Sequence, residues 1–298
     1  MGGGSALERL TALRQHQGDG KRAPHKPLLV LLALGQLAST GSSSMPWSVV
    51  QERLGALLEE FGTSASSGAS SAAYPFTRLR SDGVWELSRD VPNDNVGPLA
   101  AAPIDGHFTS EIERELRRSS ESLNAVARAL VEAQFPLTLA PDVLTAVGLD
   151  PDIVFGAPVM IEVAAKTRKR DANWRRQIVA AWDRSCAFCG YDGALRGAPV
   201  GIEAAHIRWF NFGGPDSLDN GLALCSLHHK LLDRGALGLS DLGTIFVSDA
   251  FSAVGDVGRS VYALHGRELR PRPGTELPAA DHVLWHRQEV FKGGPLAA

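Results

Sequence analysis

The sequence contains few cysteines, no long apolar segment and almost no net charge. Three of its 298 residues are cysteines, and an odd, low number argues against a disulfide framework and leaves metal binding or catalysis as the uses of interest. The longest apolar stretch, residues 28–38, contains Gly35 and Gln36 and is shorter than the ~20 residues that a membrane-spanning helix needs. The N-terminus shows neither a secretory signal pattern nor a myristoylation motif. We therefore expect a cytoplasmic protein.

The charge balance does not by itself indicate a nucleic-acid partner. Thirty Lys and Arg against 33 Asp and Glu give a net charge of −3, so any basic surface must be local. Hydrophobic residues make up 44% and charged residues 21% of the chain, which is ordinary globular composition and argues against the disordered and fibrous classes. At ~100–200 residues per domain, this length predicts two domains.

We predict an α+β protein whose first domain is mixed and mostly helical. The hydrophobic pattern is helical over residues 6–38, with a break at 18–27, and again over residues 111–135. A Ser-Asp-Gly turn signal predicts a short hairpin over residues 77–87. Residues 148–158 are rich in Gly, Pro and Asp and lack periodicity. The predicted division is a first domain at 1–155, a basic linker at 156–177 and a second domain at 178–298.

The strongest concentration of positive charge lies around Trp174. The run contains one acid, Asp171, and six basic residues: Lys166, Arg168, Lys169, Arg170, Arg175 and Arg176. The solvated face of a helix explains such a run when it stands alone. Contact with phosphates becomes the better explanation if the neighbouring domain acts on nucleic acid.

All three cysteines belong to two metal-binding hooks. Cys186 and Cys189 form a C-x₂-C pair, and Cys225 and His228 form a C-x₂-H pair. Two such hooks bring four ligands together tetrahedrally around Zn²⁺, and a site with four protein ligands has no position for a reactive water. We therefore predict a structural Zn²⁺ rather than three buried cysteines that happen to be so spaced.

The segment between the hooks predicts a strand at 201–207, a loop at 208–219, a second strand at 220–225 and then a helix. The strings Glu-Ala-Ala-His-Ile and Asn-Gly-Leu-Ala-Leu-Cys-x₂-His-His place His206, Asn220 and His229 within this frame. Over about residues 173–237 the sequence resembles the HNH endonucleases of the ββα-metal type. The resemblance implies a nuclease domain that uses a catalytic divalent metal such as Mg²⁺ or Mn²⁺.

The resemblance assigns a role to each of these three residues. It implies that His206 is the general base, that His229 binds the catalytic metal and that Asn220 braces the loop that orients His206. An imidazole with a pKa near 6.5 suits deprotonation of water near neutral pH. A divalent ion supplies charge stabilisation on the phosphate and the leaving oxygen. As isolated residues, the histidines would more often be structural, and Asn220 would more often cap a turn.

The sequence assigns the catalytic metal site only in part. His229 directly follows the zinc ligand His228, and ~100° of helix rotation points the two rings at different metals. Asp233 lies one turn beyond His229 and either joins it at the catalytic ion or braces the end of the helix. Many family members place a His or Asp ligand directly before the base, whereas this sequence has Ala205. Glu203 is therefore an additional candidate ligand.

Two strings in the first domain carry a second resemblance. They are Ala-Pro-His-Lys-Pro-Leu-Leu at residues 23–29 and Tyr-Pro-Phe-Thr-Arg-Leu-Arg at residues 74–80, with Trp85 nearby. In this order before an HNH domain, they resemble the sulfur-binding domain of McrA-type endonucleases that restrict phosphorothioate-modified DNA. The resemblance implies that the first domain recognises double-stranded DNA.

The same resemblance implies a sulfur pocket. Tyr74 and Pro75 would line a shallow apolar cup for the sulfur, with His25 and Lys26 near the adjoining backbone. Sulfur is softer and less strongly hydrated than a phosphate oxygen, so an apolar contact costs it less desolvation. Three arginines are candidates for the remaining phosphate oxygens or a guanine edge: Arg22, Arg78 and Arg80. Without the resemblance, these segments would be an ordinary strand entry and a solvated helix start.

The sequence thus predicts a restriction endonuclease that recognises phosphorothioate-modified DNA and hydrolyses phosphodiester bonds nearby. One alternative is an HNH nuclease that reads a plain sequence or a methylated base, the latter in an aromatic pocket of Tyr74, Phe76 and Trp85. Another is a non-catalytic zinc module, against which the presence of both His206 and His229 argues. Because one HNH site cuts one strand, a double-strand break needs two visits or two copies, such as a homodimer.

Overall fold

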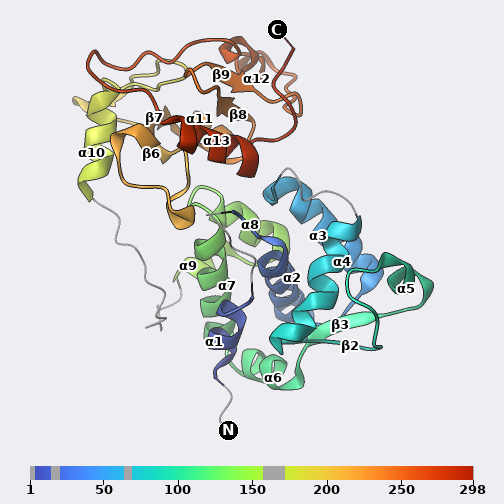
Figure 1. The fold of residues 1–298 in the computed structure, drawn as a ribbon. Coiled ribbons are helices and arrows are strands. Elements are labelled where there is room, and N and C mark those ends of the chain that lie inside the picture. The colour runs from blue at the N-terminus through green and yellow to red at the C-terminus, as the bar shows by residue number, and fades with distance from the viewer. Residues whose placement is uncertain (1–3, 15–20, 64–68, 157–171, 298) are drawn as a thin grey trace. The chain divides into compact units, whose positions relative to one another are not determined.

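The structure is a computed structural model that describes residues 4–14, 21–63, 69–156 and 172–297. Helices and strands are mixed along the chain (Figure 1), which confirms the predicted α+β class. The chain divides into two compact units, residues 1–165 and 166–298. Within the described ranges, no helix combines the length and the apolar character needed to cross a bilayer.

The first unit is built around α2 (His25–Thr40), the apolar run of the sequence. Its side chains from Leu28 to Leu34 are fully buried. It packs against α3 (Trp47–Phe61), α4 (Ala69–Arg78), α7 (Ser120–Gln134) and α8 (Ala140–Val147). The contact with α8 requires a glycine, because a Cβ on Gly35 would lie 1.8 Å from the carbonyl oxygen of Val147. The shorter helices of this unit are α1 (Ala6–Thr11), α5 (Val96–Ala101) and α9 (Pro151–Gly156).

A small antiparallel sheet completes the first unit. Its strands are β1 (Met45–Pro46), β2 (Trp85–Leu87) and β3 (Asp105–Phe108), with β3 in the middle. Trp85 pairs with Phe108 across β2 and β3, and the Trp85 ring also meets Phe76 of α4 edge-on at a centroid distance of 6.2 Å. The sheet therefore anchors α4 through an aromatic core.

The hairpin predicted over residues 77–87 is wrong. A 3-10 helix, η1 (Leu79–Asp82), continues α4, and Gly83 ends it in the left-handed conformation with φ 71°. The Ser-Asp-Gly signal therefore terminates a helix, which is a common use of glycine just past a helix end. The strand that follows pairs with β3 instead of with a preceding strand.

The single helix predicted over residues 111–135 is two helices, α6 (Ser110–Arg118) and α7. Between them Ser119 has an extended backbone with φ −139° and ψ 103°, and its hydroxyl accepts a hydrogen bond of 3.0 Å from the Ser122 amide. A serine in this position caps the second helix. Hydrophobic periodicity runs across the junction because it reports burial, and burial continues where the helix does not.

The second unit has the predicted order of strand, loop, strand and helix, which is confirmed. β6 (Ile202–His206) pairs antiparallel with β7 (Gly221–Cys225), and α11 (Ser226–Asp233) follows. The preceding helix, α10 (Ala172–Ala181), packs on both strands through the buried side chains of Trp174 and Ile178. Residues 172–177, which the sequence analysis placed in the linker, are thus part of this helix.

Further elements extend the core of the second unit beyond α11. The strands are β4 (Ala194–Leu195), β5 (Ala198–Pro199), β8 (Leu237–Leu239) and β9 (Ile245–Val247). The helices are α12 (Asp256–Arg259), α13 (Ala280–Glu289) and three 3-10 turns, η2 (Phe210–Phe212), η3 (Leu218–Asn220) and η4 (Tyr262–Leu264). The two turns η2 and η3 lie in the loop between β6 and β7.

Candidate active site

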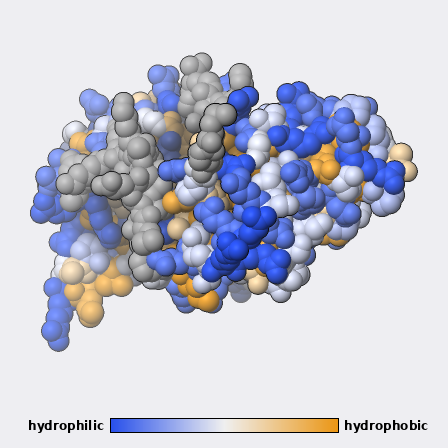
Figure 2. Space-filling model, turned by 90° about the horizontal axis from the view of Figure 1, so that it is seen from below, coloured by the Kyte–Doolittle hydropathy of each residue, from blue (hydrophilic) through white to orange (hydrophobic). Residues whose placement is uncertain are grey.

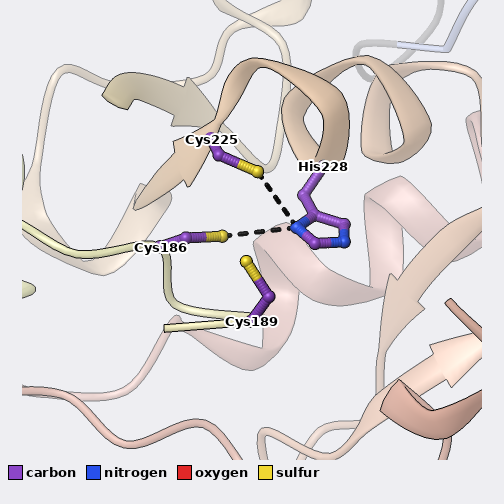
Figure 3. Close-up of side chains that lie close together, drawn as sticks. All are labelled: Cys186, Cys189, Cys225 and His228. Carbon is purple, nitrogen blue, oxygen red and sulfur yellow. Dashed lines mark hydrogen bonds between the residues drawn. The ribbon is translucent and has the colours of Figure 1, made fainter. Parts of the chain in front are cut away.

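Four side chains converge on one point beside β7 (Figure 3). The ligand atoms of Cys186, Cys189, Cys225 and His228 all lie within 4.8 Å of one another. The His228 Nδ1 atom lies 3.2 Å from the Cys225 sulfur and 3.5 Å from the Cys186 sulfur. Ligand atoms around a tetrahedral zinc with bonds of ~2.0–2.3 Å lie about 3.3–3.8 Å apart. The donor types and their spacing therefore fit zinc.

The three thiols of this cluster differ: burial raises the pKa of Cys189 to about 12 and also raises that of Cys225, so Cys186 alone of the three favours the thiolate without a metal. Burial raises the pKa of the Cys186 thiol, but hydrogen bonds from His228 and from backbone amides outweigh burial and lower that pKa to about 6. The thiolate is the form that binds metal. The cluster joins the turn after α10 to the start of α11 and so determines where that helix begins.

His206 lies at the end of β6, opposite Gly221 of β7. Its Nε2 atom lies 2.8 Å from the Asp216 Oδ1 atom. A carboxylate only accepts hydrogen bonds, so this contact puts the ring proton on Nε2 and the lone pair on Nδ1. The ring stacks on Trp174 with a centroid distance of 3.8 Å and an interplanar angle of 17°. The Asp216 contact thus determines the tautomer of His206, and the Trp174 stack and that contact together determine the orientation of its ring.

Asn220 holds both ends of the loop that follows His206. Its buried side chain accepts from the Arg208 amide at 2.8 Å and donates to the carbonyl oxygens of Arg208 and Pro215, each at 3.0 Å. Gly214 allows this closure, because a Cβ there would lie 1.8 Å from the Arg208 carbonyl oxygen. Since Asp216 follows Pro215 directly, Asn220 also positions the carboxylate that contacts His206.

His229 lies between two carboxylates. Its Nδ1 atom lies 2.7 Å from the Glu203 Oε2 atom, and its Nε2 atom lies 3.3 Å from the Asp233 Oδ2 atom. The Ser226 hydroxyl donates to the other Glu203 oxygen at 2.7 Å, and the Trp209 indole donates to the other Asp233 oxygen at 3.0 Å. Each carboxylate is therefore held by a second partner.

The electrostatics of this triad favour charge separation. The hydrogen bond from His229 outweighs burial and lowers the pKa of Glu203 to about 2. Burial lowers the pKa of His229, but the facing carboxylates of Asp233 and Glu203 outweigh it and raise that pKa. A separation of 3.3 Å between His229 Nε2 and Asp233 Oδ2 also matches two ligands bound to one ion at ~2.1 Å. This pair therefore fits a divalent metal.

The consecutive residues His228 and His229 face different groups, as the ~100° rotation per helical residue predicts. His228 turns to the three cysteine sulfurs, and His229 turns to Glu203 and Asp233. The sequence analysis considered Glu203 as a metal ligand, whereas the structure places its carboxylate on the Nδ1 side of His229, away from the Nε2 atom that faces Asp233.

In the first unit, three of the residues predicted for sulfur binding come together. The rings of His25 and Tyr74 meet edge-on at a centroid distance of 6.1 Å. The Arg78 guanidinium lies 5.5 Å from the centre of the Tyr74 ring and is paired with the Asp94 carboxylate at 2.5 Å. Tyr74 is 36% exposed, while the adjacent Pro75 is buried inside α4. Burial lowers the pKa of His25 and so favours the neutral form of its ring.

Three other predicted DNA contacts are bonded inside the unit. The Lys26 ammonium lies 2.5 Å from the Asp82 carboxylate, with only 6% and 3% of the two side chains exposed. Arg22 is buried and donates to the Phe61 carbonyl oxygen at 2.7 Å. Arg80 bonds Asp90 at 2.6 Å, as well as backbone and side-chain oxygens of the same loop. These cations hold the fold of the unit.

The basic run is described only at its end. Arg175 and Arg176 are exposed on α10. Arg175 donates to the Ile202 carbonyl oxygen at 3.2 Å, and Arg176 donates to the Asn173 side chain. The other four residues lie outside the described residues: Lys166, Arg168, Lys169 and Arg170.

The sequence analysis missed two residues of the His206 site. Asp216 stands in a Gly-Gly-Pro-Asp string, which reads as an ordinary turn. Trp174 was noticed only as part of the basic run. The one available signal for Trp174 was its helical spacing to Ile178 and Trp182, which predicts a buried face.

Family comparisons agree with both resemblances. The model of the ScoMcrA-like DNA sulfur-binding domain matches residues 4–152, half of the chain, and the model of the HNH endonuclease matches residues 186–240. Among curated proteins, none matches the sequence.

Several solved structures are similar to the first unit. The sulfur-binding domain of ScoMcrA, complexed with phosphorothioated DNA, is 22% identical with a TM-score of 0.42 and covers 48% of this chain and 97% of that one. The corresponding complex of SprMcrA is 24% identical with a TM-score of 0.40 and covers 48% and 91%. The Type IV phosphorothioation-dependent restriction endonuclease ScoMcrA is 21% identical with a TM-score of 0.42, and the match covers 48% of this chain but 29% of that one.

The match to the full ScoMcrA endonuclease thus spans less than a third of that protein's length. The two family models match successive parts of this chain, in the order that the sequence analysis expected. The chain belongs to the ScoMcrA-like DNA sulfur-binding domain family and carries an HNH endonuclease domain after that domain.

Proposed function

We propose that this protein is a phosphorothioate-dependent DNA endonuclease that acts in restriction. The first unit binds double-stranded DNA with sulfur in its backbone, and the second hydrolyses a phosphodiester bond nearby. The arrangement around β6, β7 and α11 in the HNH domain carries this proposal. There Asp216 orients the ring of His206, and His229 and Asp233, which are both of residue types that bind metal ions, lie 3.3 Å apart. The domain before it belongs to a sulfur-binding family.

His206 acts as the general base in this proposal. Its Nδ1 atom takes a proton from the attacking water while the water oxygen forms a bond to phosphorus and the bond to the leaving oxygen breaks. Asp216, which lies 2.8 Å from Nε2, stabilises the imidazolium that results. The Trp174 stack keeps the ring in line. Asn220 supports both through the loop.

His229 and Asp233 would hold the catalytic divalent ion, with Mg²⁺ and Mn²⁺ as candidates. When bound, such an ion stabilises negative charge on the phosphate and on the leaving oxygen. Glu203 acts through His229: a bound ion would displace the proton from Nε2, the atom that faces Asp233, and the contact of Glu203 with Nδ1 would hold the remaining proton on that nitrogen. Trp209 keeps the Asp233 carboxylate in place. The Cys186, Cys189, Cys225 and His228 cluster would hold a structural zinc.

Recognition of sulfur is assigned to the exposed part of Tyr74, with His25 and Arg78 beside it, and the buried Pro75 of α4 is assigned to shaping that surface. A neutral His25 ring and the exposed part of the Tyr74 ring offer an apolar contact, which suits sulfur better than a fully hydrated oxygen. Arg78 lies beside the same ring, and its guanidinium, which is paired with Asp94, would exchange this partner for an oxygen of the phosphorothioate. Lys26, Arg22 and Arg80 support this surface from inside the unit. Arg175 and Arg176, with the basic run before them, are assigned to the DNA backbone.

The structure gives no support to a pocket for a flipped base built from Tyr74, Phe76 and Trp85. Phe76 and Trp85 are buried, and their rings pack with each other and with Trp47 and Phe108. A base reader would need these faces open to its target. The non-catalytic alternative is disfavoured by the oriented His206, because a zinc module has no need of a base with a set tautomer.

The decisive experiment uses the full chain and two duplexes of the same sequence, one with a single phosphorothioate. With Mg²⁺ or Mn²⁺ present, the protein should bind and cut the modified duplex and leave the plain one intact. A His206→Ala variant should bind the modified duplex and not cut it. Equal cleavage of both duplexes would refute sulfur dependence, and no cleavage of either would refute the nuclease.

The number of copies at the DNA is a separate part of the proposal. A double-strand break needs either two HNH sites or two successive visits by one. Sedimentation of the protein on one modified duplex, combined with the order in which the two strands are cut, distinguishes a homodimer from a monomer that acts twice.

A further inference from the structure

An open pocket of about 650 Å³ lies beside α6, away from the residues assigned to sulfur. Its lining includes a histidine, three hydroxyl side chains and three arginines: Ser42, Ser44, His107, Phe108, Ser110, Glu113, Arg114, Arg117 and Arg118. Figure 2 looks onto the end of the first unit at which α6 lies, and hydrophilic residues gather there while hydrophobic ones surface in small separate areas. None of His25, Tyr74, Pro75 and Arg78 lines the pocket.

The three carboxylates of α6 are held by other segments of the unit. Glu111 pairs with Arg9 of α1 at 2.7 Å. Glu113 accepts from both the amide and the hydroxyl of Ser43, the amide at 3.1 Å. Glu115 accepts from the Ala6 amide at 3.0 Å. These bonds direct the acids of the helix to the body of the unit.

Among the residues that the structure describes, the three arginines of α6 have no such partners. Within the described part of the chain, the guanidinium groups of Arg114, Arg117 and Arg118 make no ion pair or side-chain hydrogen bond. Glu113 and Arg117 stand four residues apart, which is the usual spacing of a helical ion pair, yet the Glu113 oxygen that makes these bonds is turned to Ser43. By contrast, the other pairs Arg78–Asp94, Arg80–Asp90 and Arg128–Glu132 are formed in this unit.

We propose that this pocket binds a phosphate group, and that the phosphate comes from the DNA backbone at a place distinct from the sulfur contact. Arginine forks donate two parallel hydrogen bonds to a phosphate, and serine hydroxyls add donors at the rim. Three uncompensated guanidinium groups on one helix supply the charge that a phosphodiester needs and that apolar ligands do not. The DNA source rests on the proposed function, whereas the phosphate chemistry does not.

Charge reversal in the full chain tests the site. Arg117→Glu removes the central arginine of the pocket, and Arg89→Glu makes the same charge change at an exposed arginine of the same unit outside it. Affinity for plain and for phosphorothioate duplexes is measured from 50 to 200 mM salt. Arg117→Glu should weaken both about 3- to 10-fold relative to Arg89→Glu and flatten the slope of log K against log salt by about 0.9.

The preference for sulfur should stay unchanged in this variant, since the pocket contacts phosphate alone. Equal behaviour of Arg117→Glu and Arg89→Glu on both duplexes would overturn the DNA source. A loss confined to the modified duplex would also overturn the proposal, because the pocket would then belong to sulfur recognition. The effect of Arg117→Glu on binding to plain DNA can be measured even if the protein shows no sulfur preference. The phosphate site and the sulfur dependence can therefore be refuted independently.

Inorganic phosphate and pyrophosphate provide the arm that tests a free ligand. In the wild type, either anion should raise the melting temperature of the first unit, and this effect should be lost in Arg117→Glu and kept in Arg89→Glu. That result would support the phosphate site. If DNA binding is unaffected at the same time, the ligand of the site is a free anion. No anion effect together with unchanged DNA binding would refute the site. Arg117→Gln, which removes the charge and keeps a similar helix propensity, replaces Arg117→Glu if the latter unfolds.

Discussion

The two units differ in how far the type of a residue predicts its use. In the second unit, the residues chosen from the motif lie together: four metal-ligand side chains within 4.8 Å and His229 beside Asp233. In the first unit, all four cations chosen for DNA contact are bonded internally: Lys26, Arg22, Arg78 and Arg80. A metal site needs several donors at set spacings, so its sequence pattern is specific, whereas a DNA contact needs only an exposed charge.

The largest expected effect is on the proposed zinc site of Cys186, Cys189, Cys225 and His228. Cys225→Ala should unfold the second unit and leave the thermal transition of the first unit unchanged, because binding of a structural zinc contributes on the order of 10 kcal/mol to folding. Calorimetry and metal analysis measure both. Treatment of the wild type with a strong chelator should reproduce the variant. A variant that keeps one tightly bound zinc and both transitions would show that the ligand set is different.

The next largest effect is on cleavage by His206→Ala. Loss of the proposed general base should slow cleavage about 10²- to 10⁴-fold, while affinity for DNA stays within a few fold and zinc content is unchanged. Single-turnover cleavage and binding on the same duplex give the two numbers. Cleavage near the wild-type rate would remove His206 from the mechanism.

Lys26 distinguishes a structural cation from a ligand contact. Lys26→Met should destabilise the first unit by about 3 kcal/mol, because it leaves the Asp82 carboxylate buried without its charge partner. Urea unfolding followed on that unit measures the loss. Arg89→Met, at an exposed position, should change stability by less than about 0.5 kcal/mol. Unchanged stability with weaker DNA binding in Lys26→Met would restore Lys26 as a DNA contact.

Substitutions of Asp216 distinguish the effect of its negative charge on His206 from its effect on the orientation of the His206 ring. Asp216→Ala removes both the acceptor and the charge and should reduce kcat about 10- to 100-fold with KM unchanged. Asp216→Asn keeps an acceptor oxygen for the His206 Nε2–H and should lie between the wild type and Asp216→Ala. A purely structural role for Asp216 would instead lower the melting temperature of the second unit in step with activity.

The smallest expected effect is on the sulfur preference. Tyr74→Ala should lower the ratio of modified to plain affinity about tenfold, because loss of a partly exposed ring contact amounts to ~1–2 kcal/mol. Arg89→Ala serves as a surface control in the same unit. A ratio that remains at the wild-type value would show that sulfur is recognised elsewhere.

The elements that position the active site could be predicted because they are short and local. The order of strand, loop, strand and helix depends on apolar segments and turn residues that adjoin one another in the sequence, and so do the metal hooks. Asp216 could not be chosen, since nothing but the closed loop brings its carboxylate to His206. The same holds for the first unit, where β2 pairs with a strand that begins after α5.

The helix break at Ser119 shows a different limit. Apolar residues recur with helical spacing on both sides of it, so hydrophobic periodicity alone predicts one helix. The serine caps the second helix by a single side-chain hydrogen bond, and serines elsewhere in this chain lie within helices without such an effect. Burial can be predicted because it determines the spacing of many apolar residues, whereas a helix cap depends on one residue.

Because His228 and His229 are adjacent and contact different groups, the rotation of α11 about its own axis is fixed. One ring is tied to the cysteine sulfurs and the other to Glu203 and Asp233, so the helix is held against rotation from both sides. A single residue inserted or deleted between Cys225 and Asp233 would turn one of these rings away by about 100°. This segment can therefore accept new side chains at outward positions such as Leu227, which is 53% exposed, but it cannot change in length.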